Sequence, residues 1–186
     1  MIDCEVSYST LRHLVWKALE QYPTQNLLPM LQDTDAIVRT AVARNLHVRG
    51  GDDVFTFAIE LTNALRFEGR EIAAFLLGQL GTPNYPYRDK SIPYLRKLLF
   101  DDYYEVRGVA ASSLGWLHAD EAAYDLITLA CDPEAYVREG VAFALGRVSL
   151  TKDVQVVLEK LADDADSGVR EWALFSLEEA LAQMER

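Results

Sequence analysis

Cysteine is scarce in this chain, since the 186 residues include only Cys4 and Cys131. Two cysteines so far apart do not form the dense disulfide pattern of a small secreted domain, so a reducing compartment is the simpler inference. Neither cysteine lies in a spacing typical of a metal site. Cys131 is near the end of an apolar segment and is expected to lie in the core.

Targeting and membrane segments are also missing. The first residues lack the basic region and apolar run of a signal peptide. No stretch approaches the ~18 uncharged apolar residues that a membrane-spanning helix needs. The composition, 50% hydrophobic and 25% charged, is that of a globular protein. These features predict a cytoplasmic protein.

Catalytic and metal-binding motifs are not found. His13, His47 and His118 are far apart, and none of them is followed by Glu, so neither His-Glu-x-x-His nor a repeated His-Glu pair is present. The sequence also contains no Gly-x-Ser-x-Gly and no phosphate-binding glycine loop. It therefore predicts no metal, no cofactor and no enzymatic activity.

Positive charge is in deficit, with 18 Lys and Arg against 29 Asp and Glu, a formal net charge of −11. This charge opposes binding to nucleic acid or to an anionic membrane surface, because both depend on Lys and Arg. It favours a basic partner by charge complementarity. The alternative is that the acidic surface only keeps the protein soluble.

What the chain does contain is a repeat. Five times, an Arg is followed by apolar residues at +3 and +4 and by Leu at +7, with spacings of 31, 37, 31 and 32 residues between the arginines. The arginines are Arg39, Arg70, Arg107, Arg138 and Arg170. Three copies add a glycine at +8 (Gly78, Gly115, Gly146), and four have an aspartate at −6 (Asp33, Asp101, Asp132, Asp164). Such a period is typical of a stacked helical solenoid, and solenoids usually act as binding surfaces.

A second set of amphipathic segments lies between the Arg-bearing ones, and strand-type alternation is nowhere sustained. The sequence therefore predicts one all-α domain of helix pairs at about 24–48, 51–80, 90–118, 120–148 and 151–183. A helix at about 8–21 precedes them as a cap, with Leu11, Leu14, Val15 and Leu19 on its inner face. The longest spacing comes from an insertion near 82–89, which is either a functional contact or a tolerated surface loop.

Residues 136–146, Tyr-Val-Arg-Glu-Gly-Val-Ala-Phe-Ala-Leu-Gly, and residues 105–115, Glu-Val-Arg-Gly-Val-Ala-Ala-Ser-Ser-Leu-Gly, resemble short HEAT-like repeats, the type named after the phycobilisome lyases. The resemblance covers about residues 24–183. It implies a right-handed α-solenoid of about five helix pairs whose Arg-bearing helices line the concave surface. His47 and Glu178 replace the glycine in the first and last copies, as expected for end repeats.

A closer resemblance covers about residues 27–80. Its stretches are Leu-His-Val-Arg-Gly-Gly-Asp at 46–52, Ala-Ile-Glu at 58–60 and Arg-Glu-Ile-Ala-Ala-Phe-Leu-Leu-Gly-Gln at 70–79. They resemble HEAT-repeat proteins encoded beside Rhs polymorphic-toxin genes in enterobacteria, which are regarded as immunity proteins that bind and silence the toxin. The resemblance implies a protein partner, the basic toxic domain of an Rhs-type effector, and a monomer when free.

The helical phase identifies candidate partner-binding residues. Positions +3, +4 and +7 share one face, which is the expected core, so +1, +2, +5 and +9 are expected in the groove. The candidates are Glu71, Ile72, Phe75, Gln79, Val109, Ser112, Trp116, Glu139, Phe143, Arg147, Glu171, Trp172 and Phe175. Exposed aromatic residues among them would mark an interaction site. Alternatively, the phase is off by one residue, or the last two aromatics pack under the C-terminus.

The repeated Arg and Asp have a structural interpretation. In repeats of this type the Asp caps a helix, and the Arg pairs with acidic or carbonyl groups between adjacent repeats. We therefore expect Arg107 and Arg138 to be largely buried and paired. Asp132 before Pro133 further suggests an N-cap followed by proline at the first helical position.

Three functional hypotheses follow. The first is a non-catalytic protein that neutralises a toxin or another partner, and the second is a general protein–protein scaffold. The third is an enzyme of the bilin-lyase or DNA-glycosylase type, although the glycosylase needs a basic groove. Whether the contact is made by the groove, the convex face or the 82–89 loop is left open by the sequence.

Overall fold

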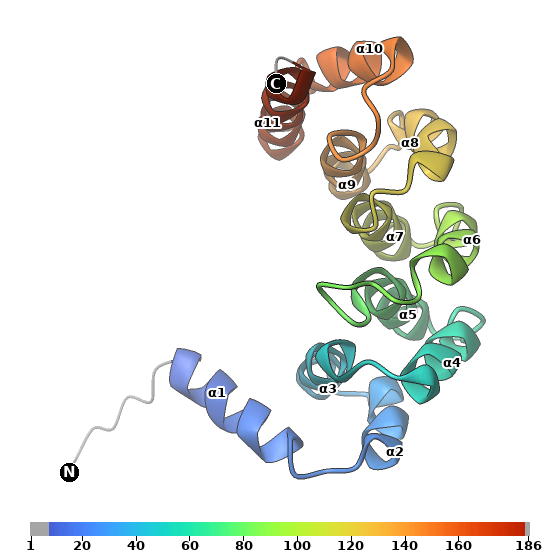
Figure 1. Ribbon diagram of the computed structural model, residues 1–186, viewed down its shortest axis with the longest axis vertical. Helices are drawn as coiled ribbons and strands as arrows, with labels where there is room; N and C mark the ends of the chain where they lie inside the picture. The colour runs from blue at the N-terminus through green and yellow to red at the C-terminus, as the bar shows by residue number, and fades with distance from the viewer. Residues whose placement is uncertain (1–7, 185–186) are drawn as a thin grey trace, which may run out of the picture.

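The computed structural model describes residues 8–184, and side chains within 13–182 (Figure 1). All regular elements in this range are helical: α1 (Tyr8–Leu19), α2 (Thr24–Leu27), η1 (Leu28–Gln32), α3 (Ala36–Arg49), α4 (Asp52–Leu61), α5 (Phe67–Gln79), α6 (Arg88–Leu98), α7 (Tyr104–Trp116), η2 (Asp120–Ala122), α8 (Ala123–Leu129), α9 (Ala135–Leu145), α10 (Lys152–Leu161) and α11 (Ser167–Met184). No described helix is both long and apolar enough to cross a membrane. Cys4 lies outside the described residues.

The helices stack as five pairs in two layers, which confirms the predicted all-α solenoid. Figure 1 shows α3, α5, α7, α9 and α11 side by side in one layer, with α2, α4, α6, α8 and α10 in the other. The layers curve so that the first one, which holds the five arginines, lies on the concave side. We call this first layer the inner layer.

The N-terminal helix α1 differs from the expected packing. Leu14 and Val15, predicted on its inner face, are exposed, whereas Leu19 packs against the core. Figure 1 shows why, since α1 projects away from the stack instead of lying along α3. Its C-terminal end is held by Arg49, whose guanidinium donates to the carbonyl oxygens of Leu19 (2.6 Å) and Tyr22 (2.7 Å). The side chain of Leu11, predicted on the same inner face of α1, lies outside the described residues.

The glycine at +8 has a steric cause in the inner layer. A Cβ at Gly78 would lie 2.8 Å from the Cα of Ser113, and a Cβ at Gly115 would lie 2.8 Å from the Cα of Ala144. Neighbouring inner helices therefore approach so closely that only glycine fits. The hydroxyl of Ser113 donates to the carbonyl of Ala74 (2.9 Å), which satisfies a buried polar group at the same contact.

The arginines form the predicted ladder between repeats, which we call the Arg–Asp rungs. Arg138 donates from Nε and Nη2 to both carboxylate oxygens of Asp164 (2.7 and 2.9 Å), and from Nη1 to two carbonyls of the loop before its own helix. Arg107 does the same with Asp132, and Arg70 with Asp101. The side chains of Arg107 and Arg138 are only 14% and 16% exposed, so the expectation for both is confirmed.

The aspartates at −6 do not cap helices, contrary to the prediction. Asp132 accepts the backbone N–H of Glu134 (3.0 Å), two residues on, within the loop. Helix α9 begins at Ala135 with Glu134 as its N-cap residue, so Pro133 lies outside the helix. Both carboxylate oxygens of Asp132 bind Arg107 of the preceding repeat, so this side chain lies in the loop and does not cap the helix.

The insertion at 82–89 packs onto the solenoid. The ring of Tyr87 stacks on Phe55 with centroids 4.5 Å apart, and its hydroxyl donates to Asp52 (2.8 Å). Tyr85 also packs against the core. Both tyrosines of the loop are therefore partly used inside the fold.

We predict that Arg138→Ala lowers the free energy of unfolding by about 3 kcal/mol, because it leaves Asp164 partly buried without its partner. Arg170 is a matched control, since it donates to carbonyls of its own loop (2.7 and 2.9 Å) and has no Asp partner among the described residues. Thermal unfolding should show a smaller loss for Arg170→Ala. Equal losses would contradict the role given to the carboxylate.

We further predict an acid-sensitive contribution from the same rung. The Arg138 guanidinium lowers the pKa of Asp164. A carboxyl whose pKa is lower in the folded state stabilises above its unfolded pKa, about 3.9, and loses this contribution as the pH falls through the folded value. The melting temperature of the wild type should therefore exceed that of Asp164→Asn by its largest amount at pH 6–7. This difference should shrink only when the pH falls below about 3.9, the pKa of an unfolded Asp. A difference independent of pH would show that charge is not its cause.

Candidate functional site

Four aromatic side chains form a continuous cluster across three inner helices, which we call the aromatic row. Trp116 of α7 lies 5.2 Å from Phe143 of α9, Phe143 lies 5.3 Å from Trp172 of α11, and Trp172 lies 6.0 Å from Phe175, all between ring centroids. Trp116 is 42% exposed and Trp172 is 40% exposed. The row therefore presents large apolar surface to solvent on the inner layer.

Arg147 extends the row at the end of α9. Its guanidinium carbon lies 4.5 Å from the ring centroid of Phe143 and 5.0 Å from that of Trp116. Both distances are within the range of cation–π attraction. Arg147 thus lies over two aromatic rings, with no acidic partner among the described side chains.

The positions expected in the core, +3, +4 and +7, are buried in the first four repeats, but several predicted groove positions are buried as well. Ile72 and Gly140 at +2 are buried, because this position turns toward the neighbouring helix, and Val109 is half-buried. Gly108 at +1 is buried as well, because the ring of Tyr136 covers it. Phe143 is only 8% exposed and lies beneath its neighbours rather than above them.

The other candidates line the inner layer to different degrees. Phe75 is half-buried and meets His47 edge to face, with centroids 5.4 Å apart. Glu71, Gln79, Ser112, Glu139 and Arg147 are half-buried, whereas Glu171, Trp172 and Phe175 are exposed. At the last repeat, Leu174 at +4 is 51% exposed, although this position was expected in the core. The reason is that no described helix follows α11.

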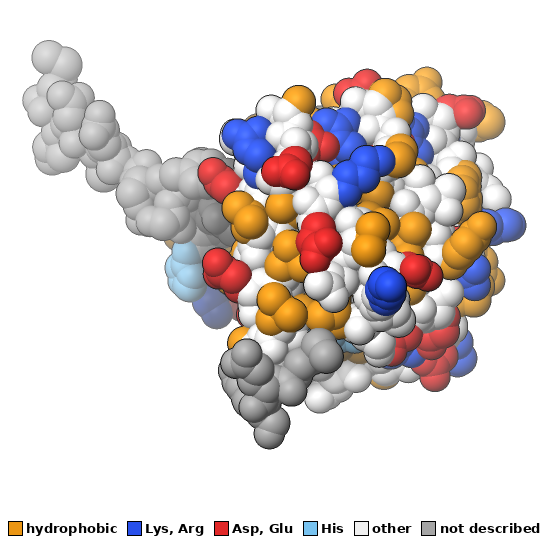
Figure 2. All heavy atoms as spheres, turned by 90° about the horizontal axis from the view of Figure 1, so that it is seen from above, with side chains coloured by type: hydrophobic (Ala, Val, Ile, Leu, Met, Phe, Trp, Pro, Cys, Tyr) orange, Lys and Arg blue, Asp and Glu red, His pale blue; other side chains and the backbone are white. Residues whose placement is uncertain are grey.

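Seen from the C-terminal end of the solenoid, apolar side chains lie on the surface among charged ones (Figure 2). The exposed apolar residues of α10 and α11 are Val156, Trp172, Leu174, Phe175 and Leu181. The predicted alternative, in which the last two aromatics pack under the C-terminus, is therefore wrong for residues 172 and 175.

Four carboxylates of successive repeats, which we call the acidic row, lie near enough to influence one another or the shared neighbour Tyr136: Glu71, Glu105, Glu139 and Glu171. Burial raises the pKa of Glu71, and the Glu105 carboxylate raises it further. Burial also raises the pKa of Glu139, together with Asp166 and Glu171. None of the four forms an ion pair with a side chain of residues 13–182. Glu71 and Glu139 are thus partly desolvated, and Arg39 is the one cation among the described side chains that offsets the charge of Glu71.

The sequence reasoning missed two tyrosines in the acidic row. Tyr104 and Tyr136 meet edge to face with centroids 6.2 Å apart. Burial raises the pKa of the Tyr136 hydroxyl, and the surrounding carboxylates, Glu71 first, add to the shift. Both tyrosines lie before the Arg of their repeat, so a search restricted to positions after the Arg could not find them.

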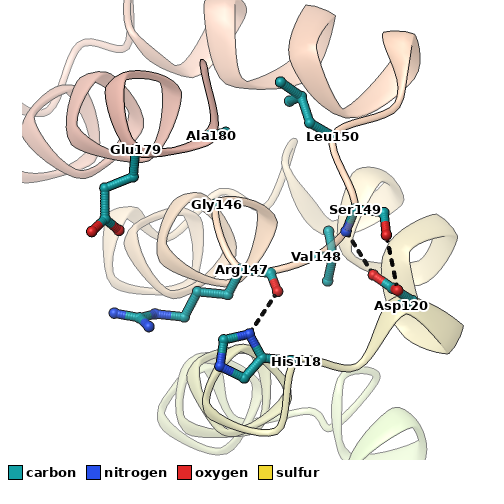
Figure 3. Close-up of a pocket in the computed structure, with 9 residues that line it drawn as sticks. All are labelled: His118, Asp120, Gly146, Arg147, Val148, Ser149, Leu150, Glu179 and Ala180. Atoms are coloured by element: carbon teal, nitrogen blue, oxygen red, sulfur yellow. Dashed lines mark hydrogen bonds between the residues drawn. The ribbon is translucent and has the colours of Figure 1, made fainter. Parts of the chain in front are cut away.

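A cavity of about 400 Å³ opens where α7, α9 and α11 end (Figure 3). His118 Nδ1 lies 3.0 Å from the carbonyl oxygen of Arg147, so in the neutral ring this nitrogen carries the hydrogen. Asp120 accepts from the backbone N–H and hydroxyl of Ser149. Figure 3 shows Arg147 and Glu179 extending from the side opposite Leu150. Arg147 and Glu179 both occupy position +9 of their repeats, so the cavity adjoins the groove on the side where the +9 residues lie.

Cys131 does not lie in the core as expected, because it follows the end of α8 and is exposed. Lys160 Nζ lies 3.5 Å from its sulfur. Within the described residues, no group of three or more His, Cys, Asp or Glu is placed to hold a metal ion. The inner layer offers apolar rings and carboxylates, which suit binding.

We predict that Glu71→Gln raises the melting temperature at pH 7, because burial disfavours the charged carboxylate of Glu71. The rise should be only roughly 1–3 °C, since solvent screens a half-buried carboxylate. A carboxyl with a raised folded pKa destabilises when charged, so the gain should disappear as the pH falls to about 4. Glu60→Gln, on the exposed side of α4, serves as the control and should leave the melting temperature unchanged. A loss of stability in Glu71→Gln would mean that the carboxylate is compensated after all.

Comparison with known proteins supports the repeat assignment. A family model described as HEAT repeats matches residues 92–178. The protein YibA of Escherichia coli K12 is 27% identical over 158 residues, which are 81% of this chain and 56% of YibA. The chain thus spans just over half the length of that relative.

Similar solved structures are solenoids of the same kind. The X-ray structure of Escherichia coli YibA superposes with a TM-score of 0.77 at 25% identity, over 90% of this chain and 62% of that one. The complex of CpcE and CpcF of phycocyanin lyase from Nostoc sp. PCC7120 gives a TM-score of 0.70 at 22% identity, over 87% and 66%. A designed armadillo repeat protein for modular peptide recognition gives 0.59 at 18%, over 92% of each chain. The last two likenesses concern the fold alone.

Proposed function

We propose that this HEAT-repeat protein is a non-catalytic binding protein whose partner lies in the concave groove, against the aromatic row and the acidic row. The observation that carries the proposal is the exposure of Trp116 and Trp172 on either side of the buried Phe143. A solvated helix face is normally polar, and tryptophan is the residue most enriched among binding hot spots.

The aromatic row and the acidic row would contribute different interactions to binding. The aromatic row supplies apolar area around a rigid centre, since Phe143 and Arg147 hold the tryptophans in place. The acidic row, with a chain net charge of −11, suits a partner that brings Lys or Arg. Because its carboxylates form no ion pair among the described side chains, a basic side chain would relieve their repulsion.

The finer proposal is that the partner is the basic toxic domain of an Rhs-type effector. It rests on the resemblance of residues 27–80 to immunity proteins encoded beside such toxins. The mechanism is stoichiometric occlusion, in which the cytoplasmic, monomeric protein covers the active site or target-binding face of the toxin without turnover. The convex face and the 82–89 loop are the alternative contact surfaces, but both tyrosines of that loop pack on the fold.

A general protein–protein scaffold is the second candidate, and the same groove would serve it. The designed armadillo protein of similar fold recognises peptides, which illustrates that a solenoid of this size suits such a role. A lyase-like activity is a more distant alternative, based on the similar fold of the lyase complex. Neither the scaffold nor the lyase-like activity requires a toxin gene beside this one.

We predict that Trp116→Ala combined with Trp172→Ala abolishes protection when the chain is co-expressed with the Rhs-type toxin domain encoded beside its gene. Removing a hot-spot residue costs about 2 kcal/mol or more, which corresponds to a roughly 30-fold weaker Kd. Phe143 is left in place because its removal would disturb buried packing.

Tyr124→Ala is the matched control, since Tyr124 lies on the outer layer and is strongly exposed. It should protect like the wild type, and circular dichroism should show all variants folded. If the double variant still protects and binds, the groove is not the contact surface. If no toxin gene adjoins this one, the scaffold is the better assignment.

A further inference from the structure

The Arg–Asp rungs are interrupted at one place, between the first and second repeats. The residue at −6 from Arg70, where three later repeats have Asp101, Asp132 and Asp164, is Ala64. Arg39 is the arginine that such an aspartate would bind. Among the repeats that are followed by another, Arg39 alone therefore lacks its carboxylate.

Arg39 keeps the remaining half of the rung. Its Nη1 donates to the carbonyl oxygens of Asp33 (2.8 Å) and Thr34 (2.9 Å), as the other arginines do with their own loops. Its Nε and Nη2, which in the complete rungs bind the two carboxylate oxygens, have no hydrogen-bond partner among the described side chains, those of residues 13–182. Arg39 is only 9% exposed as a whole residue, and the nearby carboxylates of Glu68 and Glu71 act on its charge without a hydrogen bond to it.

A cavity of about 290 Å³ lies at this point, lined by Arg39, Ala64, Arg66 and Glu68 among others. In the complete rungs the aspartate also accepts the backbone N–H two residues on, that of Tyr103, Glu134 or Asp166. The equivalent group here is the N–H of Arg66, for which the described chain offers no acceptor. The acidic lining residue, Glu68, is held by the Arg66 side chain at 2.7 Å.

We propose that this cavity is a carboxylate-binding site, in which Nε and Nη2 of Arg39 and the backbone N–H of Arg66 hold a carboxylate supplied from outside the chain. The class of ligand follows from the three complete rungs, where the same donors hold a planar Asp carboxylate bidentately. The source is an Asp or Glu side chain of a partner or a free small carboxylate. This proposal does not depend on the proposed function.

The test is a titration of the ¹⁵N-labelled protein with sodium acetate, against sodium chloride at equal ionic strength, observing the Nε–H resonances of the arginines. Arg39 should shift saturably with acetate and not with chloride. Arg107 and Arg138, already bound to aspartates, should stay in place. Arg170 has the same carbonyl contacts, but no described repeat packs over it to enclose an anion, so it should show no saturable shift.

Ala64→Asp should restore the missing rung. In this variant the Arg39 resonance should start near the positions of Arg107 and Arg138 and ignore acetate, and the melting temperature should rise by about 2–4 °C. Arg39→Lys is a second variant, since it keeps the charge but loses the fork; it should abolish the saturable, acetate-specific shift of the Arg66 backbone N–H. If Arg39 does not respond to acetate in the wild type, or responds equally in Ala64→Asp, the proposal is wrong.

Two further titrations identify which kind of carboxylate binds at Arg39. The affinity of the peptide acetyl-Gly-Asp-Gly-amide is compared with that of its Asn counterpart and with that of acetate. A roughly tenfold preference for the Asp peptide over acetate assigns the site to a partner side chain, equal affinity assigns it to a small carboxylate, and equal binding of the Asn peptide overturns the proposal. If acetate binds only to Glu68→Gln, then Glu68 fills the cavity itself, which also overturns it.

Discussion

The bidentate contact between an arginine and the aspartate of the next repeat is the constraint on which this solenoid depends. Each complete rung ties the loop before one inner helix to the loop before the next, through Arg70, Arg107 and Arg138. Because the guanidinium fork is planar and has fixed donor directions, it sets the relative position of successive helices, not merely their proximity. Its desolvation is compensated by four hydrogen bonds per arginine, including two to carbonyl groups of its own loop.

Close packing of the inner helices then determines what the groove exposes. Small residues such as Gly78, Gly115 and Ser113 stand where neighbouring backbones approach, so no large side chain fits between them. Large side chains at +5 and +9, and at +2 in the last repeat, are displaced toward the concave side. There, Trp116, Phe143 and Trp172 from three successive repeats come within contact distance of one another. The aromatic row is thus a consequence of repeat packing and of residue choice at three positions.

The concave side carries features that lower stability, namely exposed rings and partly buried carboxylates that form no ion pair among the described side chains. Such local conflicts between fold and sequence are expected where a surface serves binding rather than folding. The interrupted rung at Arg39 is a conflict of the same type on a different part of the molecule. Repeat proteins tolerate these departures because each repeat contacts only its neighbours, so the cost stays local.

The sequence by itself determined the helical class, the number of helix pairs and the pairing of Arg107 and Arg138, because these follow from periodicity and from a motif repeated in register. The sequence also shows that the aspartate at −6 is replaced by Ala64 in the second copy alone. It did not determine the burial of Ile72 and Phe143, the projection of α1 or the tyrosines beside the acidic row. Those depend on contacts between helices of different repeats, which a helical phase within one repeat cannot specify; only the tertiary packing decided them.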